Sequence, residues 1–300
     1  VEERFDRLDG TVEGEVLVTV GVLTSAADPT ESLRFARYLA ASDRGLKEFR
    51  KFGFTPIEGD KWSETPELTF FCGSVNRRAV EQTIKSFQAR EGVQVNTVFN
   101  GCGILTAQMK TITDKKLTGF PDTYMACDKY YLEIVDGLFQ DAVEISDTEV
   151  VIAVPKGNPK RIQSLADLAR PGVRVAVGQP DQCTIGVLTR QVLEAEKVYE
   201  KVMANVVTQT ATSALLIAPV STGAADAALA YLTDTKAEAE KVDAVRITSA
   251  AAKAIQPMGI AKTSHNKHLA RRLIRAITQA RSDFEAAGFH WRFEADGSGS

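Results

Sequence analysis

Residues 99–109 read FNGCGILTAQM, and this stretch decides how we interpret the chain. The alternating apolar run at 93–99 predicts a strand, and the apolar spacing from Ile104 onward predicts a helix. A strand that ends in small residues and continues as a helix leaves free backbone N–H groups at the helix start. Those donors and the positive end of the helix dipole favour an anion, with no charged side chain needed. At Cys102 the turn offers a thiol in place of the more usual hydroxyl.

The composition is that of an ordinary globular protein, and it disfavours several function classes. The chain has 300 residues, 44% apolar and 25% charged, enough for two lobes or domains with cores of their own. The net charge is −3 and the longest basic run is Arg271-Arg272, so we expect no nucleic acid as a partner. No apolar stretch approaches the ~20 residues that span a bilayer. Residues 1–15 hold no signal-peptide core, so any targeting sequence has been removed or lies upstream.

Strands alternate with helices along most of the chain, which predicts an α/β fold with parallel sheet and helices on both faces. We expect strands at 16–23, 68–71, 93–99, 150–154, 173–177, 206–208, 227–231 and 257–262. We expect helices at 43–52, 78–91, 164–169, 213–221 and 268–287, and another that starts at Asp28-Pro29. Neither a Ser-His-Asp or Cys-His arrangement nor a phosphate loop can be proposed from the spacing, so we expect no enzymatic activity.

Residues 1–60 form an extension that resembles the C-terminal end of the chain. The motif GVLTS at 21–25 is followed by Gly53-Phe54, and GIAKTS at 259–264 is followed by Gly288-Phe289. One interpretation is a common strand–helix pattern. The other, which the nearly constant spacing favours, is that the extension is the last piece of an upstream copy of the same domain. A tandem arrangement or self-association through the extension is then expected.

Four segments in order carry a resemblance to a known family. They are LTFFCGS at 68–74, FNGCG at 99–103, PDTYMACD at 121–128 and TGAADAALAY at 222–231. The second is similar to the family turn FGGSG, the third to ADVFISAD and the fourth to TGEADAGFVY. Residues 67–291 therefore resemble a type II periplasmic solute-binding protein, most closely the molybdate/tungstate-binding proteins of ABC importers.

The resemblance implies two α/β lobes with mixed or parallel sheets and a ligand cleft at the hinge. Lobe 1 would span about 67–150 and 255–291, lobe 2 about 151–254, and 292–300 would be a flexible tail. The implied function is non-enzymatic: the protein would bind a small inorganic oxyanion and deliver it to a membrane permease. It would act in the periplasm or outside the cytoplasm, with a membrane tether in a longer form. Carried over by position, the ligand-binding residues are Ser74, Val75, Cys102, Gly103, Ile185 and Tyr231. The fold also serves regulators as an effector-sensing module, but this chain has no DNA-binding segment to support that use.

The four cysteines all fall in segments that should face the cleft: Cys72, Cys102, Cys127 and Cys183. They could be small buried apolar residues, or they could form disulfides if the protein is exported. They could also be four thiolate ligands of an iron–sulfur cluster, zinc or copper. The alternative function is thus a metal- or cluster-binding, redox-active protein on the same fold. Thiols weaken the oxyanion interpretation, because S–H is a poor hydrogen-bond donor.

Overall fold

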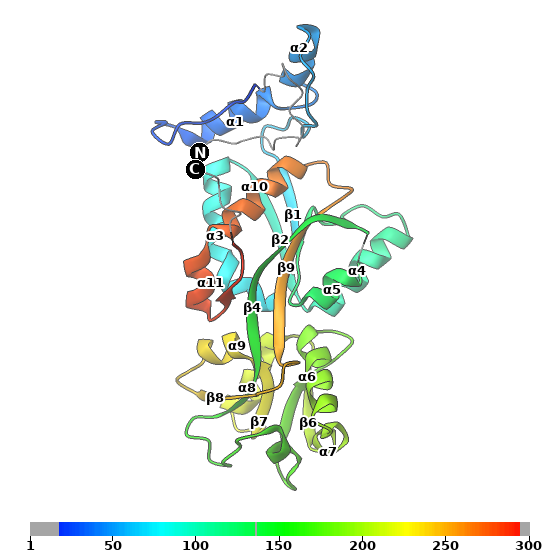
Figure 1. Cartoon of the computed structure of the whole chain (residues 1–300), viewed down its shortest axis with the longest axis vertical. Coiled ribbons are helices and arrows are strands. Elements are labelled where there is room, and N and C mark those ends of the chain that lie inside the picture. The colour runs from blue at the N-terminus through cyan, green and yellow to red at the C-terminus, as the bar shows by residue number, and fades with distance from the viewer. Residues whose placement is uncertain (1–17, 136, 295–300) are drawn as a thin grey trace.

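The computed structural model describes residues 18–135 and 137–294. Figure 1 shows three tiers along the long axis of the molecule: a pair of N-terminal helices, a middle lobe and an end lobe. We call the middle lobe, which lies next to the helices, lobe 1 and the end lobe lobe 2. The N-terminal pair consists of α1 (Pro29–Leu39) and α2 (Gly45–Lys51).

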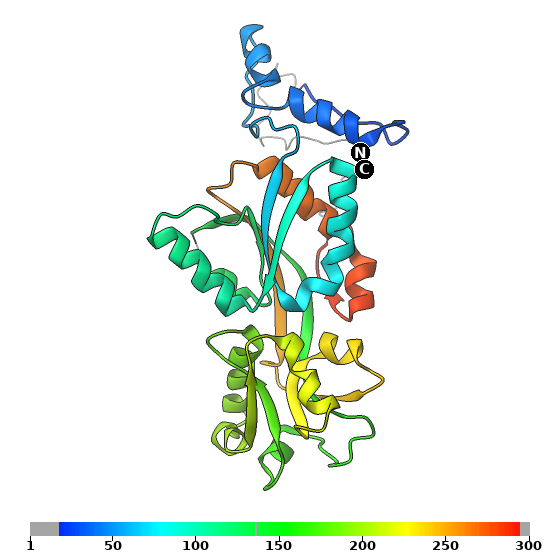
Figure 2. The same ribbon diagram turned by 180° about the vertical axis from the view of Figure 1, so that it is seen from behind.

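Lobe 1 is a mixed sheet with helices on both faces. In chain order its elements are β1 (Glu67–Gly73), the 3₁₀ turn η1 (Ser74–Asn76), α3 (Arg77–Glu91), β2 (Gln94–Asn100), α4 (Cys102–Asp114), β3 (Thr123–Met125), α5 (Lys129–Glu133), the first part of β4 (Phe139–Pro155), β9 (Lys253–Ala261), α10 (Lys267–Thr278), α11 (Arg281–Ala287) and β10 (His290–Trp291). The strand order is β2-β1-β3-β9-β4, and β10 adds a short partner to β4. Strands β1, β2 and β3 are parallel, while β9 runs antiparallel to both neighbours. Helices α3, α10 and α11 cover one face, and α4 and α5 cover the other (Figures 1 and 2).

Lobe 2 repeats this layered plan with a smaller sheet. Besides the last part of β4, its elements are η2 (Leu165–Ala169), β5 (Val175–Gly178), α6 (Thr184–Ala195), α7 (Tyr199–Met203), β6 (Val206–Thr210), η3 (Ser213–Leu215), α8 (Ile217–Ser221), β7 (Ala227–Tyr231), α9 (Leu232–Ala237) and β8 (Val242–Arg246). The order is β4-β7-β5-β6, with β8 also paired to β4. Strand β5 is parallel to β6 and β7, and β4 is antiparallel to β7 and β8.

Strand β4 runs through both sheets and, with β9, connects the lobes. Residues 139–149 pair with β9, and residues 150–155 pair with β7 and β8. The β4–β9 register shifts between Gln140 and Val143 and again between Glu144 and Ser146. Irregularities of this kind bend a strand pair and loosen its ladder. Beyond these shifts, residues 146–149 of β4 pair regularly with residues 253–256 of β9 next to lobe 2. The two lobes are therefore joined by a pair of crossing strands, where a hinge motion would take place.

The crossing strands bury polar side chains that satisfy one another. Ser146 and Gln256 are fully buried, and the Ser146 hydroxyl donates to the Gln256 side chain at 2.9 Å. The amide of Gln256 in turn donates to the Cys127 carbonyl at 3.0 Å. Buried polar groups are tolerated when they are paired in this way. These hydrogen bonds link both crossing strands to the end of β3.

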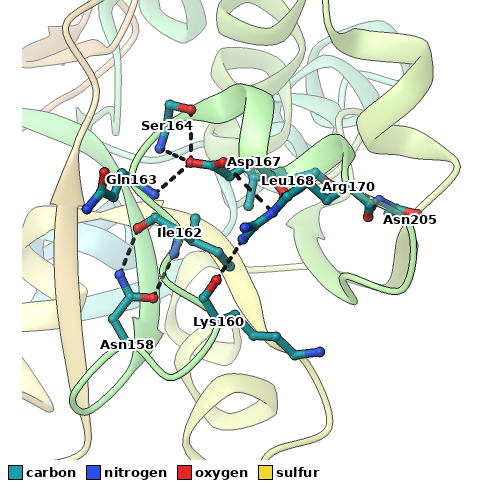
Figure 3. Close-up of polar contacts among 9 residues, drawn as sticks. All are labelled: Asn158, Lys160, Ile162, Gln163, Ser164, Asp167, Leu168, Arg170 and Asn205. Carbon is teal, nitrogen blue, oxygen red and sulfur yellow. Dashed lines mark hydrogen bonds and ion pairs between the residues drawn. The ribbon is translucent and has the colours of Figure 1, made fainter.

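The segment that leads from β4 into lobe 2 is fixed by side-chain hydrogen bonds (Figure 3). The Asn158 side chain accepts from the Ile162 amide at 2.9 Å and donates to the Ile162 carbonyl at 2.8 Å. The Asp167 carboxylate accepts from the amides of Gln163 and Ser164, each at 2.9 Å. These bonds, the one from Gln163 foremost, lower the pKa of Asp167 below its ordinary value. A loop without regular structure is thereby held in one shape where the second lobe begins.

The α/β fold class expected from the sequence is confirmed, and most helix starts are close to their expected positions. Asp28 caps α1 by accepting from the Glu31 amide at 3.0 Å. Helix α4 begins at Cys102, two residues before the expected Ile104, so the cysteine lies in its first turn. No helix among residues 18–135 and 137–294 is long and apolar enough to span a membrane.

Other expectations about the elements are wrong. The strand expected at 16–23 is not formed at 18–23, and its first two residues lie outside the described part of the chain. The single helix expected at 268–287 is broken between Thr278 and Arg281 into α10 and α11. The strand expected at 150–154 is only the end of β4. The sequence did not indicate the rest of that strand, because it contains polar residues whose partners lie far away in the sequence. The sheets are mixed, since β4 and β9 run against their neighbours, which agrees with the mixed or parallel sheets that the resemblance implies.

Candidate functional site

The first turns of two helices, one from each lobe, meet at the centre of the molecule. Helix α4 of lobe 1 follows Gly101, and helix α6 of lobe 2 follows Cys183, and neither helix has a side-chain cap. The first amides of an α-helix have no partner within the helix. One of them, Ile104 N–H, donates across the lobes to the Gln182 carbonyl at 3.3 Å. Two positive helix ends therefore point into one junction.

Two glycines make this approach possible. A Cβ atom on Gly103 would lie 2.5 Å from the Asp181 carbonyl oxygen. A Cβ atom on Gly101 would collide with the Gln182 carbonyl and lie 3.3 Å from the Cys183 Cβ. Real Cβ atoms do not approach backbone oxygens this closely, so any side chain would push the lobes apart. The structure is a closed form in which backbone touches backbone across the junction.

A pair of thiols lies beside the start of α4. The sulfur atoms of Cys102 and Cys127 are 2.6 Å apart, and the Cys127 amide donates to the Cys102 sulfur at 3.0 Å. Both are free cysteines, and both are buried. A side chain at Gly73 would collide with the Cys127 sulfur and lie 2.7 Å from the Cys102 sulfur. The turns after β1, β2 and β3 therefore converge on this pair.

The surroundings of the thiol pair shift the pKa values of the two cysteines in opposite directions. Burial raises the pKa of Cys102, but hydrogen bonds from Cys127 and from the Tyr124 and Thr184 hydroxyls outweigh it, so the pKa is lowered. Burial and the contact with Cys102 raise the pKa of Cys127 well above its ordinary value. Cys102 is therefore the member of the pair that loses its proton first. Thr184 belongs to lobe 2, so the acidity of this thiol depends on lobe closure.

Hydroxyl groups line the same junction. The buried hydroxyl of Tyr231 has no hydrogen-bond partner among the described residues. Those of Tyr124 and Thr184 have only thiols: both interact with Cys102, and Thr184 also interacts with Cys127. Tyr231 interacts electrostatically with Cys127 and Cys102, which places it at the junction. Buried polar atoms are rarely left unpaired, so these groups mark a place for a ligand or water. Together with the helix amides they form a set of uncharged donors.

The structure brings four of the six expected ligand-binding residues to this junction. Cys102 and Gly103 start α4, Ile185 follows Thr184 in the first turn of α6, and Tyr231 ends β7. The other two, Ser74 and Val75, lie in η1, which contacts η3 of lobe 2. The role of all six in ligand binding stays a prediction. Sequence reasoning missed Tyr124, and it missed Thr184, although a hydroxyl residue at the start of a helix was a usable signal.

The four cysteines do not form a four-thiolate metal site in the structure. Cys72, Cys127 and Cys183 each interact electrostatically with Cys102, so the four residues do approach one another. The Cys183 thiol, however, lies against carbonyls of its own lobe, 3.5 Å from that of Thr210, and the Cys72 thiol lies 3.7 Å from the Gly73 carbonyl. Among the residues that the structure describes, no three His, Cys, Asp or Glu side chains are grouped to hold a metal ion. The described residues give the four-thiolate site no support, and it stays a prediction.

Comparison with known proteins identifies the family. The profile of the family described as bacterial extracellular solute-binding protein matches residues 68–290. This chain belongs to that family. The resemblance drawn from the four sequence segments is thereby confirmed. Among curated relatives, the molybdate-binding protein ModA of Mycobacterium tuberculosis (strain ATCC 25618 / H37Rv) is 29% identical over 226 residues, which cover 74% of this chain and 84% of the relative.

Solved structures share the fold of this solute-binding protein. The periplasmic molybdate-binding protein of Azotobacter vinelandii matches 76% of this chain and 100% of its own, with a TM-score of 0.61 and 18% identity. The sulfate-binding protein SubI of Mycobacterium tuberculosis H37Rv matches 75% and 86%, with a TM-score of 0.62 and 18% identity. At this identity the likeness shows the fold alone.

A second place where the lobes of this solute-binding protein meet contains ionisable side chains. Arg78 of α3 and Asp234 of α9 both line a cavity of about 230 Å³. The Oδ2 atom of Asp234 is buried without a hydrogen-bond partner among the described residues. Burial raises the pKa of Asp234 to about 6, against the opposing effects of the Ser213 hydroxyl and the Arg78 charge. The closed form therefore contains a carboxyl group that prefers to be neutral.

We expect Asp234→Asn to stabilise the closed protein at pH 8 and to have little effect at pH 4. A carboxyl whose pKa is raised on folding contributes its stability below its unfolded pKa, near 3.8, and loses it as the pH rises through about 6. The free energy of unfolding at pH 8 should rise by roughly 1–3 kcal/mol in the variant. Urea denaturation at both pH values measures this.

The matched control is Asp243→Asn. The hydrogen bond with Lys156 lowers the pKa of Asp243, so this carboxylate stabilises the fold at neutral pH and the variant should lose stability there. Equal effects of Asp234→Asn at pH 4 and pH 8 would contradict the assignment.

Proposed function

We propose that this protein binds a tetrahedral inorganic oxyanion of the molybdate or tungstate kind between its lobes and delivers it to the membrane permease of an ABC importer. It would work outside the cytoplasm and catalyse no reaction. The observation that carries the proposal is the meeting of the α4 and α6 N-termini in one junction. The name of the curated relative, a molybdate-binding protein, supports the choice of ligand.

The electrostatics of the junction suit a doubly charged anion. Each helix N-terminus is equivalent to roughly half a positive charge, so the two supply about one charge between them. The remaining stabilisation would come from hydrogen bonds in a site closed to water, where such bonds to an anion are strong. The donors available are amides and hydroxyls, which are directional and match the oxygen atoms of a tetrahedral ion. A site of this kind holds the ion without a permanent salt bridge, so opening of the lobes can release it.

The hinge supplies the release step. The lobes are joined by the irregular β4–β9 pair, while their closed contact depends on the backbone approach at Gly101 and Gly103. A ligand that bridges α4 and α6 would favour the closed form over the open one by the free energy of its contacts with both lobes. A permease that separates the lobes would remove half of those contacts.

The proposal predicts a ranked response to oxyanions. Molybdate and tungstate should stabilise the protein most, sulfate less, and phosphate least. At a ligand concentration about a thousand times its dissociation constant, binding adds roughly 4 kcal/mol, which is a rise in Tm of about 10 °C for a protein of this size. Differential scanning fluorimetry and isothermal titration calorimetry measure this, and no response to any of the four ions would overturn the proposal.

We expect Gly103→Ala to weaken oxyanion binding by at least about tenfold, because its Cβ would press on the Asp181 carbonyl only when the lobes are closed. Stability without ligand should stay close to that of the wild type, since helix α4 accepts alanine readily. Gly21→Ala is the matched control, because a Cβ there meets nothing within 4 Å. Calorimetric titration with molybdate checks both variants, and unchanged affinity of Gly103→Ala would show that ligand binding does not need this closed contact.

We expect Cys102→Ser to strengthen binding by about tenfold. A hydroxyl is a better donor than a thiol, and serine has no tendency to become an anion where Cys102 has a lowered pKa. The control is Cys72→Ser, which changes a buried thiol that lies against the Gly73 carbonyl in its own lobe. That variant should lose stability but keep the molybdate affinity of the wild type, and a similar change of affinity in both variants would contradict a direct role for Cys102.

A further inference from the structure

The N-terminal helices are a structural copy of the last two helices of lobe 1. Helices α1 and α2 have 11 and 7 residues, and α10 and α11 have 12 and 7. Each pair follows a segment with the similar sequences GVLTS and GIAKTS. The repeat seen in the sequence therefore extends to the lengths and order of the helices.

The ends of the two pairs match in detail at a constant offset of 235 residues. The matching residues are Phe49, Gly53 and Phe54 in the first pair and Phe284, Gly288 and Phe289 in the second. The two phenylalanine rings of each pair have centroids 5.6 Å apart. Both glycines have positive φ, 86° and 95°, and in both pairs the amide of the second phenylalanine donates to the carbonyl of the first. Both ends have the helix-end motif in which an αL glycine is followed by an apolar residue that bonds and packs onto the last turn, so the shared sequence pattern specifies this agreement locally.

The two copies differ in what covers them. Phe284 and Phe289 are 0% and 3% exposed, because α11 packs on α3, α9 and β10. Phe54, the equivalent of Phe289, is 46% exposed, and the neighbouring Phe52 is 80% exposed. Phe54 is thus open to solvent where its counterpart Phe289 is buried, while Phe49 is half-buried.

The segment before α1 also lacks the neighbours that cover its counterpart. In the second copy the corresponding strand, β9, lies between β3 and β4 and pairs with both. In the first copy the described part of the β-rich sequence VLVTVGVL, residues 18–23, forms no strand. Val18 and Leu23 are 52% and 76% exposed. The segment has the composition of a central strand and lacks a sheet to join.

The contacts that hold the N-terminal helices to lobe 1 are mostly polar. Arg37 donates to the Glu91 carbonyl at 2.6 Å, and the Asp60 carboxylate accepts from the His268 and Leu269 amides at 3.0 and 2.9 Å. More than half of the large apolar side chains that the described residues expose lie between 18 and 57; they include Val18, Leu23, Phe35, Tyr38, Phe52 and Phe54. Lobe 1 therefore anchors the extension through charges and leaves its apolar side uncovered.

We propose that residues 18–54 are the final strand and helices of a second solute-binding lobe, and that the exposed apolar surface is where that lobe packs. The occupant is an upstream copy of this domain on the same polypeptide, whose β3 and β4 equivalents take residues 18–23 between them as the last strand of their sheet. Equivalents of α3 and α9, which here help to bury Phe284 and Phe289, are supplied to Phe49 and Phe54 by that copy. The inference concerns packing and is independent of the ligand.

The test uses a fusion that rebuilds the upstream copy from this sequence. Residues 66–258 are placed directly ahead of residues 21–300, so that Gly21 follows Met258 as Gly259 does in the present chain. We expect two folded units, and we expect the amides of 22–23 and 29–51 to exchange hydrogen about a hundredfold more slowly than in the present chain. An unfolded first unit beside a folded second unit would overturn the proposal.

Phenylalanine variants sharpen the test. Phe54→Ala should leave the Tm of the present chain unchanged within about 2 °C but lower that of the first unit of the fusion by roughly 10 °C. Phe289→Ala should lower the Tm of the present chain by a similar amount, and the exposed Leu117→Ala should change neither protein. A neutral Phe54→Ala in a folded fusion would overturn the proposal.

Two further measurements cover the remaining outcomes. If neither unit of the fusion folds, a second variant is tested: the present chain with residues 259–289 replaced by residues 21–54. Loss of a cooperative unfolding transition in that variant would overturn the proposal. Sedimentation of the present chain should show a monomer, because its own lobe 1 already holds a complete set of strands and helices. A dimer that Phe54→Ala dissolves would instead make a second copy of this chain the occupant.

Discussion

The closed arrangement of this protein depends on a backbone-to-backbone contact between the start of α4 and the loop before α6. Side chains are excluded there, because a Cβ at Gly101 or Gly103 would press on carbonyl oxygens of the other lobe. The contact brings two uncapped helix ends together, which is electrostatically unfavourable unless an anion or dipoles lie between them. The close approach that the glycines allow thus brings two positive helix ends together, and a bound anion would stabilise this arrangement. The crossing strands matter because bending them would separate the two helix ends and weaken their hold on an anion.

The thiol pair modifies that electrostatic balance. In a low-dielectric junction, Cys102 accepts hydrogen bonds from Cys127, Tyr124 and Thr184, and they lower the pKa of its thiol despite burial. A negative charge on Cys102 would use part of the positive potential of α4 and compete with a bound anion. A serine in this place would not. In the proposed function, Cys102 would lower the affinity for an anion and make binding depend on the protonation of its thiol, in contrast to a serine in the FGGSG pattern that the turn resembles.

What the sequence predicted well is local chemistry. The α4 turn, the Asp28 cap and the alternation of strands and helices each depend on residues within a few positions of one another, so the fold class could be inferred from them, whereas the expected ligand-binding residues came from the family resemblance. The crossing strand β4 was mostly missed, because Ser146 and other buried polar residues in it are paired with residues more than a hundred positions away. Thr184 was missed for a related reason, since only the folded structure brings it to Cys102. The metal cluster was inferred from cysteine positions alone, and the direction in which the Cys183 thiol points argues against it.

Residues 18–23, which form no strand, show what strand formation depends on in this chain. Its composition favours a strand as strongly as that of β9, yet β9 is ordered by neighbours on both sides and residues 18–23 are not. Strand formation depends on pairing and on burial of the side chains, so residues 18–23 would need neighbouring strands in order to form a strand. The helices that follow it keep their caps, their αL glycine and their ring pair, because those features are local. If the proposed upstream copy exists, the extension has the features that a lobe end can hold by itself, and that copy would add a sheet and an α3 helix.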